Sequence, residues 1–317
     1  MLKYLVIQLA DDSVSYCHYE NSSKSEQFIS VENLKAAIRF GMVENLNIQF
    51  VYPTRTLPEG YDKVIETIDH TKILPCDAPS AKRADIIVCN SIAEIKNCKL
   101  HKEQIVILRI GRKNINEMEH VYDFAKDKCA RLNIVVIDID KFSETEFNEY
   151  KSILAQLGDK VQSDIIEGNN IQLNLLTDRL VLKAMNNCNA GDEVITLMPN
   201  GRFYPCAGFY YDNPDEDFGD LIRGLQIKNR QLFKLNYAPI CRHCDAFHCH
   251  RCVWINRKTT LEVNTPSHEQ CVVSHLERNE SSRILSLIRE KNEFNSDISI
   301  PQKDYLDPFE NIIKNKI

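Results

Sequence analysis

The sequence predicts an α/β protein with a partial (β/α)6 barrel in its first half and a small cysteine-rich domain with a C-terminal helix in its second half. Two observations lead to this prediction. Short apolar runs alternate with helical patterns through the first half, and seven of the twelve cysteines lie between residues 188 and 271. This change in composition predicts a domain boundary near residue 187.

Six apolar runs in the first half are expected to form buried strands, at 3–10, 46–52, 71–75, 85–90, 104–110 and 132–138. Helical patterns fall between or after them, at 31–43, 60–68, 91–97, 113–130 and 143–164. This alternation is typical of a parallel sheet built from βα units. Six units fit an open barrel better than a closed barrel of eight, and a doubly wound sheet is the alternative. The sequence contains no GxGxxG motif and no P-loop.

The second half has a different pattern. A helical segment is expected at 173–186, and a hairpin at 194–206 with Asn200–Gly201 as its turn. A further strand is expected at 259–266, followed by a long helix that starts near Thr265 or Ser267, with Pro266 in its first turn. The predicted domains are therefore a barrel at 1–187, a cysteine-rich domain with its helix at 188–294, and a polar tail at 295–317.

Charge and hydropathy limit the expected partners. The chain has 39 basic and 45 acidic residues, a net charge of −6, which argues against nucleic acid or an anionic membrane as its main partner. The N-terminal apolar run is too short for a signal peptide, and no run approaches transmembrane length. A cytoplasmic protein is expected. Because disulfides are disfavoured there, metal binding is the expected role of the cysteines.

The segment 241–252 reads CRHCDAFHCHRC. The number of cysteines in and around it indicates which metal cofactor they could bind. The candidate metal ligands of the second half are Cys188, Cys206, Cys241, Cys244, Cys249, Cys252 and Cys271. One zinc ion takes four ligands, so seven thiolates exceed one tetrahedral site. Two four-iron clusters need eight, or seven with one iron left open. A haem is excluded because no C-x-x-C-H occurs, and a zinc ion on the four central cysteines is the alternative to iron–sulfur clusters.

The expected positions of the cysteines outside segment 241–252 favour iron–sulfur clusters over a single zinc ion. The predicted hairpin would carry Cys206 back toward Cys188, and Cys271 falls in the first turn of the predicted long helix. A helix N-terminus stabilises a thiolate.

The spacing C-x12-G-x4-C, followed by C-x2-C-x4-C-x2-C and one distal cysteine, resembles the SPASM domain of radical S-adenosylmethionine enzymes that modify peptides. The resemblance covers about residues 188–275, and two gaps in the central motif are one residue shorter than usual. It implies that Cys241, Cys244, Cys249 and Cys271 hold one 4Fe–4S cluster, and that Cys188, Cys206 and Cys252 hold three corners of another. Residues 165–187 contain no cysteine, so the fourth corner is expected to be open or taken by a non-cysteine ligand.

In that superfamily the barrel carries a C-x3-C-x2-C motif after its first strand, for the cluster that cleaves S-adenosylmethionine. Here the corresponding stretch contains only Cys17, and one thiolate cannot hold that cluster. S-adenosylmethionine is therefore not expected as a cofactor.

The whole chain resembles the CXXX repeat peptide maturases, on the segments SVSYCHYEN (13–21), NLNIQFVYP (45–53) and CHRCVWINRKTTLEVNTPSHEQCVVSHLERN (249–279). The resemblance implies an iron–sulfur accessory protein that binds a Cys-x-x-x repeat precursor peptide, a separate intact radical enzyme, or both. The alternatives are an autonomous peptide-modifying enzyme that uses an open cluster corner, and a zinc-stabilised adaptor. No catalytic residue is predicted.

The remaining cysteines and histidines are interpreted more simply. Buried or incidental thiols are expected at Cys76, Cys89, Cys98 and Cys129. Cys17 and His18 lie where a barrel site would open. Neighbours of the ligands or surface groups are expected at His243, His248 and His250, one of which could replace a missing thiolate. His268 and His275 are interpreted as ordinary helix residues.

Overall fold

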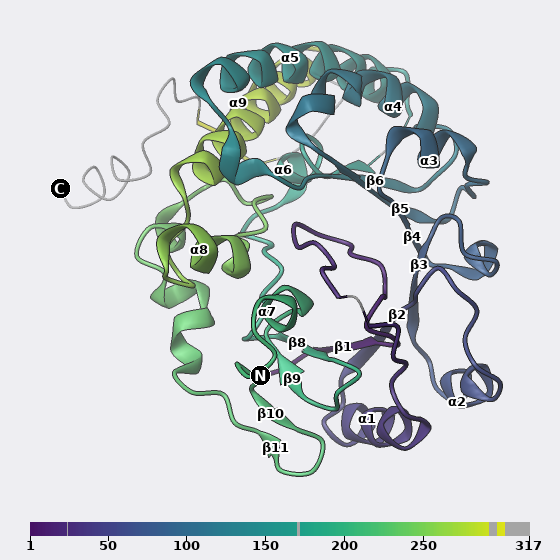
Figure 1. The fold of residues 1–317 in the computed structure, drawn as a ribbon. Helices are drawn as coiled ribbons and strands as arrows, with labels where there is room; N and C mark the ends of the chain where they lie inside the picture. Colours follow the sequence, from purple (N-terminus) through teal and green to yellow (C-terminus); the bar gives the residue numbers. More distant parts are fainter. Residues whose placement is uncertain (24, 170–171, 292–296, 302–317) are drawn as a thin grey trace.

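The computed structural model describes residues 1–317 except 24, 170–171, 292–296 and 302–317. Within these residues, the central feature is a curved nine-stranded sheet in the spatial order β7-β6-β5-β4-β3-β2-β1-β8-β9 (Figure 1). Neighbouring strands are parallel, except that β9 runs antiparallel to β8. The strands are β1 (Tyr4–Gln8), β2 (Asn47–Val51), β3 (Thr71–Pro75), β4 (Ile86–Cys89), β5 (Ile105–Ile110), β6 (Arg131–Val136), β7 (Gln172–Leu173), β8 (Val194–Leu197) and β9 (Phe203–Tyr204), with a separate pair β10 (Gly219–Asp220) and β11 (Gly224–Leu225).

Helices lie along the outer face of this sheet (Figure 1), namely α1 (Val31–Val43), α2 (Tyr61–Ile65), α3 (Ile92–Asn97), α4 (Met118–Ala125) and α5 (Glu144–Ile166). The remaining α-helices of the described residues are α6 (Asp178–Val181), α7 (Ala207–Asp212), α8 (Val253–Thr260) and α9 (His268–Glu290). Serine side chains accept a backbone N–H at the starts of α1, α3, α5 and α9, which satisfies donors that a helix start leaves free. The predicted partial barrel of the first half is confirmed, with all six strands in place.

The second half differs from the prediction in three places. Within 173–186 only α6 is α-helical, because the Asn174 side chain bonds both backbone groups of Ile134 and holds its segment against β6. The prediction of a strand at 259–266 is wrong. Residues up to Thr260 continue α8, and the hydroxyl of Thr260 donates to the carbonyl of Asn256 at 2.8 Å, as a threonine on a helix does. Pro266 precedes the N-cap Ser267 instead of lying in the first turn of α9.

The predicted hairpin is confirmed as β8 and β9, and Gly201 in its turn has φ = 77°, a value that favours glycine. The division at residue 187 stays a prediction, although the sheet continues past it through β8. Of the tail predicted at 295–317, only residues 297–301 are described. No helix among the described residues is both long and apolar enough to span a membrane.

The inside of the barrel is filled by the chain itself. A small apolar cluster takes one buried side chain from each of the first six strands, namely Val6, Val51, Ile73, Val88, Ile107 and Val135. Val14 and Tyr16 pack against it, and both belong to the segment 9–30 between β1 and α1, which is called the inner loop below. Figure 1 shows the inner loop running inside the ring of strands. The larger core lies on the other face of the strands and includes α1, α4, α5 and α9.

Candidate metal centres

Four cysteines that lie far apart in the sequence meet in one place. Cys17 belongs to the inner loop, Cys188 precedes β8, and Cys206 and Cys252 are the N-cap residues of α7 and α8. Burial raises the pKa of Cys252, and the neighbouring charges of Cys188, Cys17 and Cys206 raise it further. Such effects require nearby groups. The four thiols therefore form one group, the first thiol set.

The backbone around the first thiol set is arranged to donate to sulfur. In each case a backbone N–H two or three residues after the cysteine bonds its sulfur, and the donors are Tyr19, Ala190, Gly208 and Ile255. Hydrogen bonds of this kind favour the charged thiolate. Burial has the opposite effect and raises the pKa of Cys17 to about 12. The set therefore suits a cation that replaces the thiol protons.

Four further cysteines form a second thiol set around a cavity. Cys241, Cys244, Cys249 and Cys271 line an empty volume of about 430 Å³, part of it open to solvent. Cys271 lies in the first turn of α9, as the sequence predicted, and the other three belong to the loop before α8. Burial raises the pKa of Cys241 to about 12 and that of Cys244 to about 11, so neither thiol ionises readily without a cation.

Polar neighbours of the second thiol set point at its sulfurs. The backbone N–H of Ala246 bonds the sulfur of Cys244 at 3.4 Å, and that of Arg251 bonds the sulfur of Cys249 at 3.4 Å. His275 Nε2 also lies 3.4 Å from the sulfur of Cys244. His275 lies on α9, as the sequence predicts, but its contact with Cys244 was not predicted. The missed signal was its position four residues after Cys271, on the same face of α9.

A buried cation lies close to both thiol sets. Arg251 is 1% exposed and donates through Nη2 to the carbonyl of Phe233, while its Nε and Nη1 find no partner among the described residues. Burial raises the pKa of Cys188 in the first set and of Cys241 in the second, and the charge of Arg251 opposes both rises. An unpaired buried guanidinium is costly, so the site lacks an anionic acceptor.

The backbone of Arg251 also separates the two sets. Its φ is 45°, in the left-handed region that non-glycine residues rarely adopt. It lies between Cys249 of the second set and Cys252 of the first. The turn at Arg251 therefore directs neighbouring cysteines to different sites, and this local strain is typical of functional segments.

The barrel strands hold Cys17 in place. Arg109 of β5 is buried and donates to the carbonyls of Cys17 and Tyr19, at 2.8 Å each. His18 Nδ1 lies 3.1 Å from the carbonyl oxygen of Val136, at the end of β6. These contacts fix the inner loop on both sides of the thiol.

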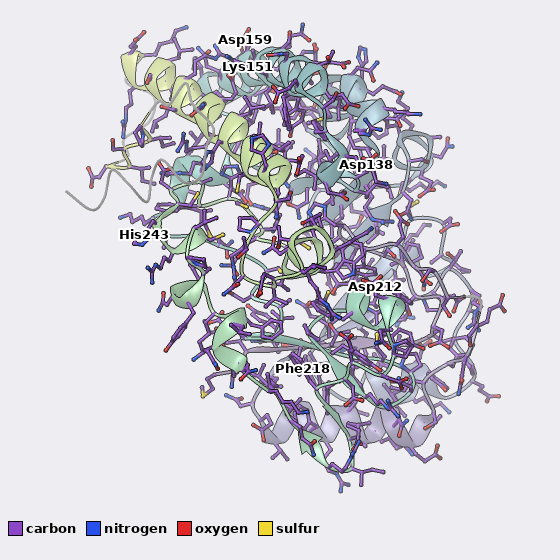
Figure 2. The ribbon with its side chains drawn as sticks, turned by 60° about the vertical axis from the view of Figure 1, so that its left-hand side comes forward. Asp138, Lys151, Asp159, Asp212, Phe218 and His243 are labelled. Atoms are coloured by element: carbon purple, nitrogen blue, oxygen red, sulfur yellow. The ribbon has the colours of Figure 1, made fainter. Side chains whose placement is uncertain are left out.

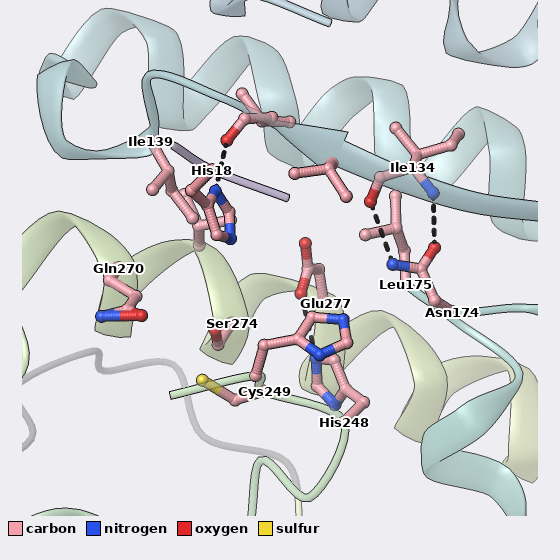
Figure 3. Close-up of a pocket in the computed structure, with 14 residues that line it drawn as sticks. His18, Ile134, Ile139, Asn174, Leu175, His248, Cys249, Gln270, Ser274 and Glu277 are labelled. Atoms are coloured by element: carbon pink, nitrogen blue, oxygen red, sulfur yellow. Dashed lines mark hydrogen bonds and ion pairs between the residues drawn. The ribbon is translucent and has the colours of Figure 1, made fainter. Parts of the chain in front are cut away.

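The loop of the second set is anchored to α9 and α5 beside a pocket with both apolar and polar lining residues (Figure 3). His248 Nε2 lies 3.0 Å from Glu277 Oε2, and Tyr150 OH donates to Glu277 Oε1 at 2.6 Å. Because His248 precedes Cys249, this buried chain of contacts positions that thiol. His248 is therefore a buried neighbour of Cys249, one of the predicted ligands. His243 is exposed at the edge of the molecule (Figure 2).

Cys17 lies near the other thiols of the first set. The sequence predicts that the fourth corner of this cluster is open or held by a non-cysteine ligand, and in the structure the thiol of Cys17 is close to those of Cys206 and Cys252. The contact depends on sheet order, because β8, which follows Cys188, lies beside β1, which precedes Cys17. The remaining cysteines lie outside both sets, as predicted; Cys129 is buried alone, while Cys76, Cys89 and Cys98 lie together. Across the described ranges, no group of three or more His, Cys, Asp or Glu side chains is arranged to hold a single metal ion.

Comparison with solved structures identifies the fold. A structure of hexahistidine-tagged anSMEcpe with bound AdoMet, an anaerobic sulfatase-maturating enzyme, matches with a TM-score of 0.63 and 16% sequence identity. The match covers 92% of this chain and 100% of that one. The chain has the fold of this enzyme. A second anSMEcpe structure, with bound AdoMet and the Cp18Cys peptide, matches equally well, with a TM-score of 0.63 at 15% identity over 92% of this chain and 100% of that one.

The likeness to anSMEcpe concerns the fold, since identity is low. Streptococcus suis SuiB bound to its precursor peptide SuiA overlaps less, with a TM-score of 0.41 and 13% identity over 67% of this chain and 61% of SuiB. The chain matches no protein-family model and no curated protein.

Proposed function

We propose that this chain is an iron–sulfur protein that holds two 4Fe–4S clusters. The observation that carries the proposal is the grouping of eight cysteines into two sets of four, with Cys17 completing the first set. Eight thiolates are the number that two four-iron clusters require. Two zinc ions would need the same number of thiolates, so the metal and sulfide content of the protein distinguishes the two cofactors.

The residues around the two sets fit a negatively charged cofactor. When bound, such clusters supply one-electron transfer. Arg251 would direct its two unpaired nitrogens at the cofactor, and the backbone N–H groups that bond the sulfurs would stabilise the thiolates. The inner loop and α9 would keep solvent away from the first and second sets respectively.

We further propose an accessory role in peptide maturation. The fold is that of anSMEcpe, one structure of which contains a bound peptide. The inner loop has one cysteine where a three-cysteine motif would be needed, and its side chains pack against the inner face of the barrel. A chain of this kind would bind a Cys-x-x-x repeat precursor peptide, a separate intact radical S-adenosylmethionine enzyme, or both.

Metal analysis tests the cofactor. Anaerobically reconstituted protein is expected to contain about eight irons and eight sulfides per chain. In Cys17→Ala one iron of the first cluster loses its protein ligand, so this iron becomes exchangeable and the cluster spectrum shifts when an external thiol is added. Cys129→Ala, which changes a buried thiol outside both sets, is the matched control and retains the wild-type spectrum. Stoichiometric zinc without sulfide would establish the adaptor alternative instead.

A peptide titration tests the accessory role. Since Cys17 completes the first set, a Cys-x-x-x repeat peptide and its Cys→Ser counterpart are expected to bind wild-type protein without changing the cluster spectrum. A spectral change with the cysteine peptide alone would show that a corner is open, as the autonomous-enzyme alternative requires. If neither peptide binds, the precursor peptide is not a partner of this chain, and the accessory role would consist of binding the radical enzyme alone.

A further inference from the structure

Five tyrosine side chains form a continuous row between the inner loop and the hairpin of β8 and β9, which is called the tyrosine row below. In spatial order its members are Tyr16, Tyr19, Tyr211, Tyr210 and Tyr204. Consecutive ring centroids lie 5.8, 5.8, 5.4 and 5.4 Å apart, distances typical of aromatic rings in contact. The first two rings belong to the inner loop, the next two to α7 and the last to β9. The row therefore joins the inner loop to α7, which lies beside it (Figure 1).

One end of the tyrosine row borders the first thiol set. Tyr16 directly precedes Cys17 in the chain. Burial raises the pKa of Tyr16, and the charges of Cys17, Cys206 and Cys188 raise it further, which requires that these groups lie nearby. The helix that carries the middle of the row, α7, has Cys206 as its N-cap. The row thus begins next to the sulfurs of the first set and leads away from them along the inner loop and α7.

The hydroxyl groups of the row differ in what they can donate to. Tyr210 OH donates to the carboxylate oxygen Oδ1 of Asp11 at 2.9 Å. Tyr211 and Tyr204 donate to backbone carbonyls, at 3.1 and 2.6 Å respectively, and Tyr19 OH has no partner among the described residues. A carboxylate can take up a proton completely, whereas a backbone carbonyl cannot. Within the row, as far as the structure describes its contacts, Tyr210 alone has a proton acceptor.

This difference matters for one-electron chemistry. A tyrosine that loses an electron becomes a strong acid and must also lose its phenolic proton to form a stable neutral radical. Burial and the charge of Asp11 raise the pKa of Tyr210, so the phenol keeps its proton until it is oxidised. Asp11 is 5% exposed, so solvent competes little for the carboxylate that receives this proton. An oxidising equivalent that moves between the touching rings is therefore expected to settle at Tyr210.

From this arrangement we propose that Tyr210 and Asp11 form a proton-coupled redox site, which the tyrosine row connects to the first thiol set. The oxidant is an organic radical, the class of species that the partner enzyme of the proposed function generates. The supply of an electron from the first set rests on the proposed iron–sulfur function, whereas the redox site at Tyr210 does not. The row gives the chain a route for single electrons between the first set and a radical outside it.

Electrons and protons balance in two steps. In the first, the radical R• takes one electron from Tyr210 and one proton from solvent and becomes R–H, while Tyr210 gives its proton to Asp11 and becomes a neutral tyrosyl radical. In the second, Tyr210 regains one electron through the other rings of the row, supplied from the first thiol set, and Asp11 returns the proton. The net change is the loss of one electron from the first set and the reduction of R• to R–H.

The site is tested by flash oxidation of the complete chain with photo-oxidised tris(bipyridine)ruthenium, followed by freeze-quenching and electron paramagnetic resonance. Wild-type protein is expected to give a tyrosyl radical signal. Tyr210→Phe is expected to lose the signal, and Asp11→Asn to lower it, because an amide does not take up the proton. Tyr122→Phe removes a tyrosine that bonds a carboxylate, that of Asp164, outside the row, and is the matched control that keeps the signal. Tyr237→Phe, which removes the most exposed tyrosine of the described residues, is expected to keep it as well.

The connection to the first thiol set is tested by the lifetime of the radical. In iron-loaded protein that has been reduced beforehand, the signal is expected to disappear faster than in oxidised protein, because an electron arrives through the row. Tyr19→Phe keeps the ring and removes a hydroxyl that has no partner among the described residues, so the variant should fold as wild type does. Since phenylalanine is not oxidised under these conditions, Tyr19→Phe is expected to lose the fast decay. Iron content and circular dichroism check each variant for folding.

Each contrary result overturns a defined part of the proposal. A signal that survives in Tyr210→Phe places the radical on another residue and refutes the site. An unchanged yield in Asp11→Asn shows that Asp11 is not the proton acceptor. Equal decay in wild type and Tyr19→Phe refutes the connection through the row. Protein that holds zinc and no iron would overturn the proposed function and the electron supply with it, whereas the signal at Tyr210 would still be expected, so the two failures are distinguishable.

Discussion

Replacing Arg251 with glutamine is expected to make both proposed clusters harder to reduce. Arg251 brings a positive charge close to thiols of both sets, and two of its nitrogens have no partner among the described residues. Reduction adds negative charge to a cluster, and a nearby cation stabilises that added charge. Arg251→Gln removes the cation with little change in length, so the reduction potentials should fall.

The size of the effect follows from the burial of the side chain. Two unit charges about 4 Å apart interact with about 4 kcal/mol at an effective dielectric constant of 20, and with about half of that at twice the distance. Arg251 is 1% exposed, so salt screens its charge little. For a one-electron couple, about 1.4 kcal/mol corresponds to about 59 mV. The expected decrease for the nearer cluster is therefore about 80 to 170 mV.

The assay is a potentiometric titration followed by electron paramagnetic resonance, on protein with the wild-type iron content. Arg251→Lys keeps the charge and is expected to stay near the wild-type potential, which separates charge from packing. Arg242→Gln removes an exposed arginine of the same loop and is the matched control. If Arg251→Gln and Arg242→Gln both leave the potentials unchanged, the charge of Arg251 does not face the clusters, and the reasoning from its unpaired nitrogens is refuted.

Two further predictions concern the barrel. With dithionite and S-adenosylmethionine, the isolated chain is expected to give no 5′-deoxyadenosine above background, because Cys17 is the only cysteine of the inner loop; clear turnover would contradict this interpretation of the barrel. Asp164→Asn is expected to lower the free energy of unfolding by about 1–3 kcal/mol, because it weakens the hydrogen bonds with Tyr122 and Lys126. Burial tends to raise the pKa of Asp164, but these hydrogen bonds outweigh it and the pKa is lowered. A carboxyl group with a lowered folded pKa stabilises the fold above its unfolded pKa and loses that contribution as pH falls through the folded value. The stability of the metal-free wild type should therefore decrease more than that of Asp164→Asn between about pH 5 and about pH 3, as urea unfolding measures; equal decreases would exclude this role.

The sequence by itself determined the barrel. The six apolar runs are long enough for one buried strand each and are separated by helical patterns, so parallel βα units follow from local sequence. The predictions failed where tertiary contacts compete with local preference. At 173–186, hydrogen bonds from Asn174 to β6 replace the expected helix, and at 259–266 the threonine hydroxyls bond back to α8.

The resemblance to the SPASM domain implied the grouping of the second thiol set, whereas the spacing of the cysteines alone left Cys252 as an alternative fourth member in place of Cys271. Its members Cys241, Cys244 and Cys249 lie in one loop, and Cys271 follows at the start of the next long helix. Local turns and one helix bring these four cysteines to one cavity in the structure.

Only the tertiary structure decided the place of Cys17, of Arg251 and of the three thiols on the barrel. Cys17 meets Cys188 because β8 adds to the sheet beside β1, and no local pattern specifies that order. Cys76 and Cys89 become neighbours through the register of β3 and β4, which side-chain packing across the whole sheet fixes. Contacts between residues distant in sequence depend on how complete elements pack, so the sequence supplies the thiols and the fold determines which of them meet.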